Sequence, residues 1–462
     1  CKIMGLFNSI RMGSSAAGDY EVKRSLRFND DDSAYLNRTP SNGGDRRVFT
    51  LSWWIKLGNS ANSTSTFTIF SAQRNTLNPS LEIRLQENRL VIVGNKDGSS
   101  SSYMFSLVTE QLFRDPTAWY HFVVAFNTSD STASNRIKIY VNGSQITSFS
   151  AGSTGLTADT YPSSGDQTSW GTNEAEQQIG RKFGGSAYFD GYLAEINVVD
   201  GSQLTPSSFG ETNADTGQWN PKKYVGSYGN SDNGYYLNFS NSSSLGTDSS
   251  GNGNNFTPNN FGTGDSVKDS PTNTFATWNP LSTKNLPTLS EGNLKNLSDN
   301  NKACNSTFGV TSGKWYWEMH ILTDISSSNY IAATGVTSYQ MENEGDTSPN
   351  LASAGRSYYR GMTSGGVYAY KNYTSTSHTE VSSGGTFYGG AVISFRLDMD
   401  AGTLKYYTNN TLVHTDSTIP TDGTVIFPMQ NATNSGTSRH NASIINFGQD
   451  STFAGNKTAQ GN

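Results

Sequence analysis

The stretch between residues 119 and 146 constrains the fold more than any other part of the chain. Two runs of strand-forming residues, 119–126 (WYHFVVAF) and 137–141 (IKIYV), flank a polar loop. The second run ends at Asn142 and Gly143. Asn-Gly is the strongest short signal for a type I′ hairpin turn, because both central residues of that turn need φ > 0. The stretch therefore predicts antiparallel strands, with a tight turn after the last long one.

The composition of the whole chain agrees with an all-β protein. Charged residues make up 15% of the 462 residues, and 47 residues are glycine. An average soluble protein has roughly 25% charged residues. Short runs of aromatic and β-branched residues alternate with Ser, Thr, Asn and Gly, and these two groups favour strands and turns respectively. At about 150 residues for each domain, the length predicts about three domains.

Charge and cysteine content exclude several classes of partner. The net charge is −6 and no run of basic residues occurs, so we expect no nucleic-acid partner. No apolar stretch approaches the ~18 residues of a membrane span, so we expect no membrane insertion. The two cysteines, Cys1 and Cys304, are too few for a disulfide framework. A fold held by packing alone suits assembly in a reducing cytoplasm.

Residues 23–210 resemble a laminin-G/concanavalin-A-like domain. The segments that carry the resemblance, in the order of that family, are 24–39 (RSLRFNDDDSAYLNRT), 48–59 (VFTLSWWIKLGN), 119–146 and 179–206 (IGRKFGGSAYFDGYLAEINVVDGSQLTP). In the second segment, alternation places four apolar residues on one face of a strand: Phe49, Leu51, Trp53 and Ile55. The resemblance implies a jelly-roll β-sandwich. That fold is used far more often to bind glycans and proteins than to catalyse reactions.

Residues 281–455 resemble a SPRY domain. The matching segments are 306–322 (STFGVTSGKWYWEMHIL), 331–336 (IAATGV) and 387–413 (FYGGAVISFRLDMDAGTLKYYTNNTLV). Two positions depart from the family pattern, because Ala391 replaces an Asp and Asn410 replaces a Gly. Asn is the next best residue where φ is positive. Since SPRY is itself a concanavalin-A-like sandwich, we expect an all-β chain of two tandem concanavalin-A-like β-sandwiches.

Two further segments complete the expected domain order. Residues 1–22 form a short N-terminal arm that is rich in small residues. Residues 211–280 form an Asn/Gly/Ser-rich connecting segment with one strand, 234–240 (GYYLNFS). A lone hairpin is not stable by itself, so this strand must pack on a flanking domain. It is either the remnant of a second, truncated laminin-G-like domain or a strand added to a neighbouring sheet.

The order of all these segments resembles virion-associated fibre or decoration proteins of tailed bacteriophages, of the marine phage type. The resemblance implies a virion surface protein, either tail fibre or capsid decoration, that presents lectin-like domains to a host-surface glycan or protein. It also implies a homo-oligomer, with a trimer favoured. Apolar residues of the arm are expected to attach to other virion proteins: Leu6, Phe7, Ile10 and Met12. The alternative is a secreted or cell-surface glycan-binding adhesin.

A laminarinase-like glycoside hydrolase is the enzymatic alternative, because those enzymes share the sandwich fold. They carry an E-x-D-x-(x)-E pattern that places two catalytic carboxylates on one strand. The nearest string here contains Glu195, Asn197 and Asp200, so an amide replaces the middle acid. The five histidines are scattered, and no serine-hydrolase or nucleotide-binding motif occurs. The sequence therefore predicts a protein that is not an enzyme.

Calcium is the most credible ion, and we expect no other cofactor. Asp248, Ser250 and Asn252 supply oxygen atoms at positions 1, 3 and 5 of an EF-hand-like loop, with Gly253 at position 6. Position 12 is Asn259, which cannot give the bidentate carboxylate of that motif. The alternative is a simple Asx-turn.

Aromatic side chains in polar, loop-rich regions are the candidate glycan-binding residues, because sugar rings stack on exposed aromatic faces. The first domain offers Trp170, Tyr188 and Tyr192. The candidates of the second domain are Arg356, Tyr358, Tyr359, Tyr368, Tyr370 and Tyr373. SPRY domains generally bind through loops at one edge of the sandwich, which favours the second group. The alternative is that these rings belong to the core or its rim.

Overall fold

The structure is a computed structural model of the chain. It describes residues 20–58, 65–73, 80–95, 103–173, 175–229, 233–281, 286–298, 302–322, 330–338, 357–362, 367–371, 379–383, 389–434 and 441–457. In strands β24, β25 and β26, and in parts of β23 and β30, it describes the backbone alone. The chain divides into two compact units, the first ending at Asn273 and the second beginning at Thr274. Each unit has its own pair of antiparallel sheets.

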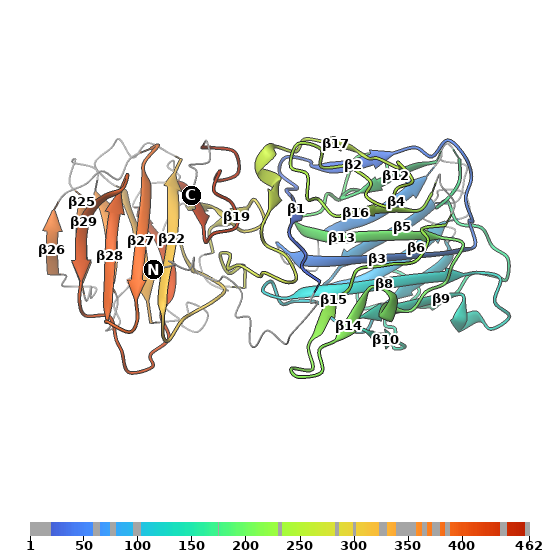
Figure 1. The fold of residues 1–462 in the computed structure, drawn as a ribbon, viewed down its shortest axis with the longest axis horizontal. Coiled ribbons are helices and arrows are strands. Elements are labelled where there is room, and N and C mark those ends of the chain that lie inside the picture. The colour runs from blue at the N-terminus through green and yellow to red at the C-terminus, as the bar shows by residue number, and fades with distance from the viewer. Residues whose placement is uncertain are drawn as a thin grey trace. The chain divides into compact units, whose positions relative to one another are not determined.

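The first unit is a sandwich of two eight-stranded sheets, in which β3, β8 and β13 lie side by side (Figure 1). Sheet 1 has the order β10 (Ser144–Ile146), β9 (Ile137–Val141), β8 (Trp119–Asn127), β3 (Val48–Leu57), β13 (Gly191–Asp200), β1 (Ser25–Phe28) and β18 (Ser266–Val267), with β16 (Tyr235–Leu237) also pairing with β13. Sheet 2 has the order β11 (Asp159–Thr160), β7 (Tyr103–Val108), β6 (Arg89–Asn95), β5 (Ser80–Gln86), β4 (Thr66–Gln73), β12 (Glu176–Ile179), β2 (Tyr35–Arg38) and β17 (Thr257–Asn259).

The core of the first unit lies between these two sheets. The four alternating residues of β3, Phe49, Leu51, Trp53 and Ile55, are all fully buried in it, as their spacing predicts. The Trp53 ring packs edge-on against Phe70 of sheet 2, with 5.0 Å between ring centroids. The core is largely aromatic and aliphatic, which suits a sandwich whose inner faces interdigitate.

The hairpin predicted at Asn142 and Gly143 is present. It joins β9 to β10, and the two residues have φ of 46° and 84°, as a type I′ turn requires. A short hairpin, β14 (Gly210–Thr212) with β15 (Trp219–Pro221), brings Trp219 against this turn. A Cβ on Gly143 would lie 2.6 Å from the Trp219 ring, so glycine is needed there for space as well as for φ.

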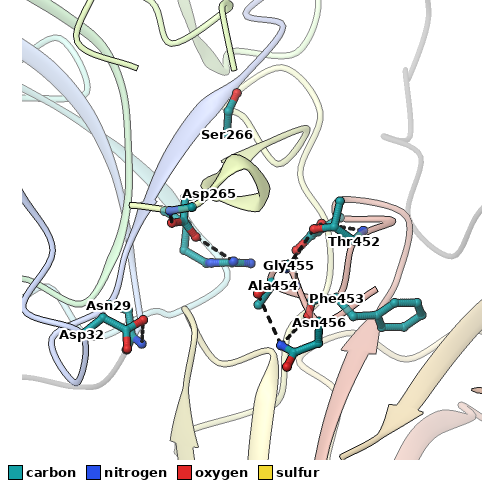
Figure 2. Close-up of polar contacts among 12 residues, drawn as sticks. Asn29, Asp32, Asp265, Ser266, Thr452, Phe453, Ala454, Gly455 and Asn456 are labelled. Atoms are coloured by element: carbon teal, nitrogen blue, oxygen red, sulfur yellow. Dashed lines mark hydrogen bonds and ion pairs between the residues drawn. The ribbon is translucent and has the colours of Figure 1, made fainter. Parts of the chain in front are cut away.

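The segment 211–280 adds strands to both sheets of the first unit. Strand β16 pairs with β13, β17 pairs with β2 and forms the edge of sheet 2, and β18 pairs with β1. Ion pairs hold the same segment in place. Arg27 Nη2 lies 2.8 Å from Asp265 Oδ1, at the end of the 3₁₀ turn Thr263–Asp265 (Figure 2). The sequence left two interpretations of this segment, the remnant of a second domain or a strand added to a neighbouring sheet. The structure agrees with the added strand.

The second unit is also a two-sheet sandwich. Sheet 3 has the order β19 (Thr288–Ser290), β20 (Lys295–Ser298), β31 (Asn441–Asn446), β22 (Lys314–Ile321), β27 (Val392–Asp398), β28 (Thr403–Thr408) and β29 (Thr411–Asp416). Sheet 4 has the order β21 (Lys302–Asn305), β30 (Phe427–Asn434), β23 (Tyr330–Thr337), β24 (Ser357–Met362), β25 (Val367–Lys371) and β26 (Thr379–Ser383). The Trp317 and Phe395 rings stack in its core, with centroids 4.9 Å apart.

In two turns of the second unit, asparagine and aspartate residues explain the conformation of the backbone. Asn409 and Asn410 join β28 to β29 with φ of 46° and 67°, so asparagine does replace glycine at a left-handed position. The carboxylate of Asp450 accepts hydrogen bonds from the backbone N–H groups of Thr452 and Ala454, and this orders the C-terminal turn (Figure 2).

The prediction of an all-β fold with two sandwiches is confirmed. The helical elements among the described residues are the 3₁₀ turns Ala133–Asn135, Pro206–Ser208 and Thr263–Asp265, each of three residues. None of the helical turns in the described part of the chain is long or apolar enough to cross a membrane.

Candidate functional site

The outward face of sheet 2 carries mainly polar side chains, apart from an apolar cluster of Val91, Val93 and Val108 under Leu156. Strands β2, β12, β5 and β6 turn one set of residues into the core: Leu36, Ile179, Ile83 and Ile92. Their neighbours in sequence point the other way, because alternate residues of a strand face opposite sides. In cross-strand register these outward residues form one row over all eight strands: Thr257, Asn37, Gln178, Ser71, Glu82, Val93, Ser106 and Thr160.

Hydrogen bonds hold the side chains of this row in fixed orientations. Glu82 Oε1 accepts from the Thr68 hydroxyl at 2.9 Å, and its Oε2 accepts from Arg84 at 2.8 Å. Near the other edge, Asn37 Nδ2 donates to Glu176 Oε1 at 2.8 Å. The middle of the row is buried, from Gln178 through Ser71 and Glu82 to Ser106. At its end next to β17, Asn37, Glu176 and Thr257 are exposed or partly exposed, and their amide, carboxylate and hydroxyl groups can match the hydroxyl groups of a sugar.

A short loop places aromatic and cationic groups over one end of the row. The loop spans residues 181–188 and is closed by a bridge between Lys182 and Ser186. The Arg181 guanidinium carbon lies 3.4 Å from the centroid of the Tyr35 ring, and Arg181 Nε donates to Gln178 Oε1 at 2.9 Å.

Tyr188, on the same loop, lies near the stacked pair. Its ring centroid is 6.5 Å from that of Tyr35. All three side chains, Tyr35, Arg181 and Tyr188, are partly exposed. We call these three residues the Tyr35 patch.

The three aromatic candidates of the first domain have different surroundings. Tyr188 is partly exposed and belongs to the Tyr35 patch. Trp170 is 1% exposed and packs on Phe70, and Tyr192 is fully buried beside Lys56. The structure therefore corrects the expectation for Trp170 and Tyr192, because neither ring offers an exposed face on which a sugar could stack.

The second group of candidates lies where less of the chain is described. Arg356 and Tyr373 are outside the described residues, as are the four arm residues Leu6, Phe7, Ile10 and Met12. The four tyrosines at positions 358, 359, 368 and 370 belong to the edge-side strands β24 and β25, whose backbone alone is described. In the register, Tyr358 is directly opposite Tyr370. A binding role for this group stays a prediction.

Sequence reasoning missed Tyr35 and Arg181 as site residues. The two are far apart in sequence, and the antiparallel pairing of β12 with β2 brings them together. The local signal is weak, because neither 35–38 (YLNR) nor 176–179 (EQQI) shows a strict alternation of apolar and polar residues. The sequence also does not say which loop would cover the outward face of sheet 2.

The loop proposed for calcium is held by its own hydrogen bonds. Asp248 Oδ1 accepts from the backbone N–H groups of Tyr236 and Ser250, each at 2.9 Å. Its Oδ2 accepts from the Ser250 hydroxyl and from Asn254 N. These contacts are those of an Asx-turn, and within the described residues no three His, Cys, Asp or Glu side chains gather as metal ligands. Calcium binding at Asp248, Ser250 and Asn252 stays a prediction.

Glu195 has surroundings that do not suit a glycosidase. It lies at a bulge in β13 with φ of 50°, is 6% exposed, and accepts hydrogen bonds from the hydroxyls of Tyr20 and Tyr236 at 2.7 and 2.8 Å. Burial raises the pKa of Glu195 to about 7, although the tyrosine hydrogen bonds and Lys223 oppose the shift.

Asp200, the other acid of that motif, cannot act with Glu195. Five residues of strand span roughly 16 Å, more than the ~5–9.5 Å between paired catalytic carboxylates. The Asp200 carboxylate also accepts a hydrogen bond from Asp45 N at 2.9 Å.

A serine–histidine contact in sheet 1 is structural as well. Ser52 Oγ lies 2.9 Å from His121 Nε2, the spacing of a nucleophile and its base. However, Trp219 Nε1 donates to His121 Nδ1 at 2.9 Å. In the neutral ring the proton is therefore on Nε2, which donates to Ser52 and cannot take its proton. Burial lowers the pKa of His121 to about 3, so the ring is neutral at physiological pH.

Comparison with known proteins identifies the first domain. A family model described as "Concanavalin A-like lectin/glucanases superfamily" matches residues 29–208. Residues 29–208 of the first unit therefore resemble a concanavalin-A-like domain. No curated protein matches the chain.

Solved structures with some likeness include mouse laminin α1 domains LG4-5, at 9% identity, with 95% of this chain and 92% of that one covered and a TM-score of 0.31. The SPRY domain of human HERC1 is 17% identical, with 33% and 87% covered and a TM-score of 0.25. A pentraxin from Limulus polyphemus is 20% identical, with 40% and 80% covered and a TM-score of 0.27.

The concanavalin-A-like domain gives the general class of function. Laminin-G-like and SPRY-like domains are typically binding modules for carbohydrates or proteins. The first domain has the fold of such a module, and the Tyr35 patch is the part of its described surface where aromatic, cationic and hydroxyl-binding groups meet.

Proposed function

We propose that this chain is a virion surface protein, a tail fibre or capsid decoration subunit, that binds a glycan of the host envelope. The observation that carries the binding part is the Tyr35 patch beside the polar row of sheet 2. A tyrosine ring gives the apolar face on which a sugar ring stacks, while the partly exposed Asn37 and Glu176 at the end of the row bind hydroxyls. The virion part is supported by the order of segments along the chain.

Binding is tested with the purified full-length protein on an array of bacterial envelope polysaccharides. For a glycan that the wild type binds, Tyr188→Ala and Arg181→Ala should each weaken binding about tenfold, which corresponds to about 1.4 kcal/mol. Tyr161→Ala is the matched control, since Tyr161 is a partly exposed tyrosine that packs on the core and on Phe149. Equal affinities for all four proteins would contradict a glycan site at the Tyr35 patch.

The arm is proposed to attach the protein to the particle through Leu6, Phe7, Ile10 and Met12, in a homo-oligomer of three chains. The boundary of the arm matters for the test. The Tyr20 hydroxyl binds Glu195, and the backbone N–H and C=O of Val22 both bind Thr272 Oγ1. A deletion should therefore end at residue 19, because removing Tyr20 would disturb the first unit.

The arm deletion separates attachment from folding. The variant that lacks residues 1–19 should keep the wild-type thermal transition but be absent from particles purified from infected cells, as judged by mass spectrometry. Light scattering should give the mass of three chains for the wild type. Normal incorporation of the variant would show that the arm is dispensable. Labelling of intact bacteria rather than particles by a specific antibody would favour the adhesin alternative.

The proposed function is binding without catalysis. Asp200 is too far along β13 to act with Glu195, and His121 is in the wrong tautomer to activate Ser52. Incubation with laminarin and with bacterial polysaccharides should release no oligosaccharide. Released oligosaccharide that persists in Glu195→Gln would point to a different catalytic centre, and release abolished by that change would establish a hydrolase.

A further inference from the structure

The outward face of sheet 3 carries a second patch of aromatic and cationic side chains. The alternating residues of β22, β27 and β28 that enter the core are Trp317, Phe395, Leu397, Leu404 and Tyr406. Tyr316, Arg396 and Tyr407 are each next to one of these core residues in sequence, so they face outward on three neighbouring strands. Leu412 of β29 is directly opposite Tyr407 and is 50% exposed.

Arg396 is held between the two tyrosines. Its guanidinium carbon is 4.5 Å from the centroid of Tyr407 and 6.0 Å from that of Tyr316. The Tyr316 hydroxyl donates to Glu318 Oε1, which fixes the second ring. Stacking on aromatic faces leaves the N–H groups in the plane of the guanidinium free to bind a ligand. The described residues provide no hydrogen-bond acceptor for them, and the Arg396 side chain is exposed.

A second cation lies next to Arg396. Lys405 is directly opposite it in the register of β27 and β28, where Cβ atoms are about 4.5–5.5 Å apart. Lys405 is exposed and has no ion-pair partner in the described part of the chain. The remaining cation of this face, Lys314, is paired with Asp398. Glu318 lies on the same face, where its carboxylate accepts the hydrogen bond from Tyr316, and neither Arg396 nor Lys405 forms an ion pair with it in the described part of the chain. Two adjacent cations outside ion pairs, on a chain of net charge −6, favour an anionic ligand.

We propose that Arg396 and Lys405, framed by Tyr316 and Tyr407, bind the acidic group of an anionic polysaccharide. Arginine binds carboxylate and sulfate groups with two parallel hydrogen bonds, and lysine adds a point charge. The exposed Leu412 and the outer edge of Tyr407 give the apolar surface that the sugar ring needs. This site rests on the proposed glycan-binding function but lies on the other unit, so it can fail while the Tyr35 patch holds.

Binding to surfaces that carry three polymers tests the site with full-length protein. Polygalacturonate supplies carboxylates, dextran sulfate supplies sulfates, and neutral dextran supplies neither. The wild type should bind one or both acidic polymers, more weakly as salt rises, and should not bind dextran. Arg396→Gln should lose about tenfold in affinity, Lys405→Gln about threefold, and Arg396→Lys an intermediate amount because it keeps the charge without the paired donors.

Two control variants make the outcome specific. Lys138→Gln removes the same charge from β9 of the first unit and should leave binding to the acidic polymers unchanged. Tyr161→Ala, at a partly exposed tyrosine outside both patches, should also leave it unchanged. Thermal unfolding of each variant checks that the second unit stays folded. The proposal is overturned if neither acidic polymer binds, if dextran binds as well as they do, or if Arg396→Gln binds like Lys138→Gln.

Discussion

The left-handed backbone of Glu195 determines where its carboxylate points. The register of β13 with β3 shifts between Ala194 and Asn197, and the extra residue in this bulge turns the Glu195 side chain toward Tyr20 and Tyr236. Asn197 Oδ1 in turn accepts a hydrogen bond from Tyr228 at 2.7 Å. The bulge thereby builds a buried cluster of three tyrosines around one carboxyl group, and burial raises the pKa of each of these tyrosines as well.

Replacing Glu195 with Gln should change how stability depends on pH. The pKa of Glu195 is about 7 in the fold, against 4.5 in an unfolded chain, so the folded state binds the extra proton between these values. The wild type should therefore lose free energy of unfolding as pH rises from about 4.5 to 7, on the order of 3 kcal/mol at most. Glu195→Gln removes this loss.

Denaturant unfolding at pH 5 and at pH 8 measures this effect, with hydrogen exchange of the β13 amides as the probe of the first unit. Glu195→Gln should gain stability relative to the wild type between pH 5 and pH 8. His121 titrates in both proteins and cancels in the comparison. The same difference between the two proteins at both pH values would contradict the raised pKa.

Trp219 should stabilise the fold through its indole N–H. In Trp219→Phe the buried Nδ1 of His121 loses its donor, and such an unsatisfied atom costs about 1–3 kcal/mol. Trp315→Phe is the matched control, because Trp315 also donates from Nε1, to Ser312 O, but at an exposed site. We expect a clear drop in thermal midpoint for the first change and little for the second. Equal drops would show that ring size, rather than the hydrogen bond, matters.

At the scale of single elements, the segment that contains β18 is tied to sheet 1 by a buried ion pair. Lys56 Nζ of β3 lies 2.7 Å from Asp269 Oδ2, both side chains are fully buried, and Trp119 Nε1 donates to Asp269 Oδ1 at 3.1 Å. Asp269→Asn should cost about 3–5 kcal/mol, because it leaves the Lys56 charge buried without this carboxylate.

A double replacement separates charge from packing at this pair. In Lys56→Met with Asp269→Leu no charge is buried, so most of the lost stability should return. Thermal unfolding of the single and double variants gives the comparison. A double variant as unstable as Asp269→Asn would mean that the hydrogen bonds of Asp269, rather than its charge, hold the segment.

The sequence predicted those elements whose signal is local. The alternation of apolar residues predicted the buried face of β3, and Asn142 with Gly143 predicted the hairpin. The strand 234–240, which contains β16, was predicted with two alternative roles, and addition to a neighbouring sheet was one of them. The roles of β17 and β18 could not be predicted, because these strands of two or three residues pair with partners distant in sequence. The candidate site was predicted only at Tyr188. Exposure of an aromatic ring depends on what packs above it, as the buried Trp170 and Tyr192 show.

At the scale of the whole molecule, the chain has two separate cores. The main core of the first unit uses residues between 26 and 256, and that of the second unit uses residues between 276 and 454. The boundary after Asn273 lies a little before the expected start of the second domain at residue 281, because Trp278 already belongs to the second core. Separate cores of this size predict independent folding.

Cutting the chain at this boundary tests independent folding. Residues 1–273 and 274–462, expressed separately, should each unfold cooperatively with a midpoint close to that of one transition of the full chain. A cut at 210, the end of the family-like segment, should instead give an unstable first fragment, since it removes β16, β17 and β18. A stable 1–210 fragment would contradict the role given to these strands.

Strand β1 is synthesised long before β18, the last strand that pairs with it. Ser25 pairs with Val267, so roughly 240 residues must leave the ribosome before this edge is covered, which takes roughly 10 to 50 seconds at typical rates of translation. Until then the growing chain exposes an unpaired edge that can join other nascent chains. Chains stalled on the ribosome with residue 250 exposed should be cut by protease within the first unit, while chains with residue 290 exposed should resist. Polysomes that crowd many such chains together are therefore where this protein is most at risk of aggregation.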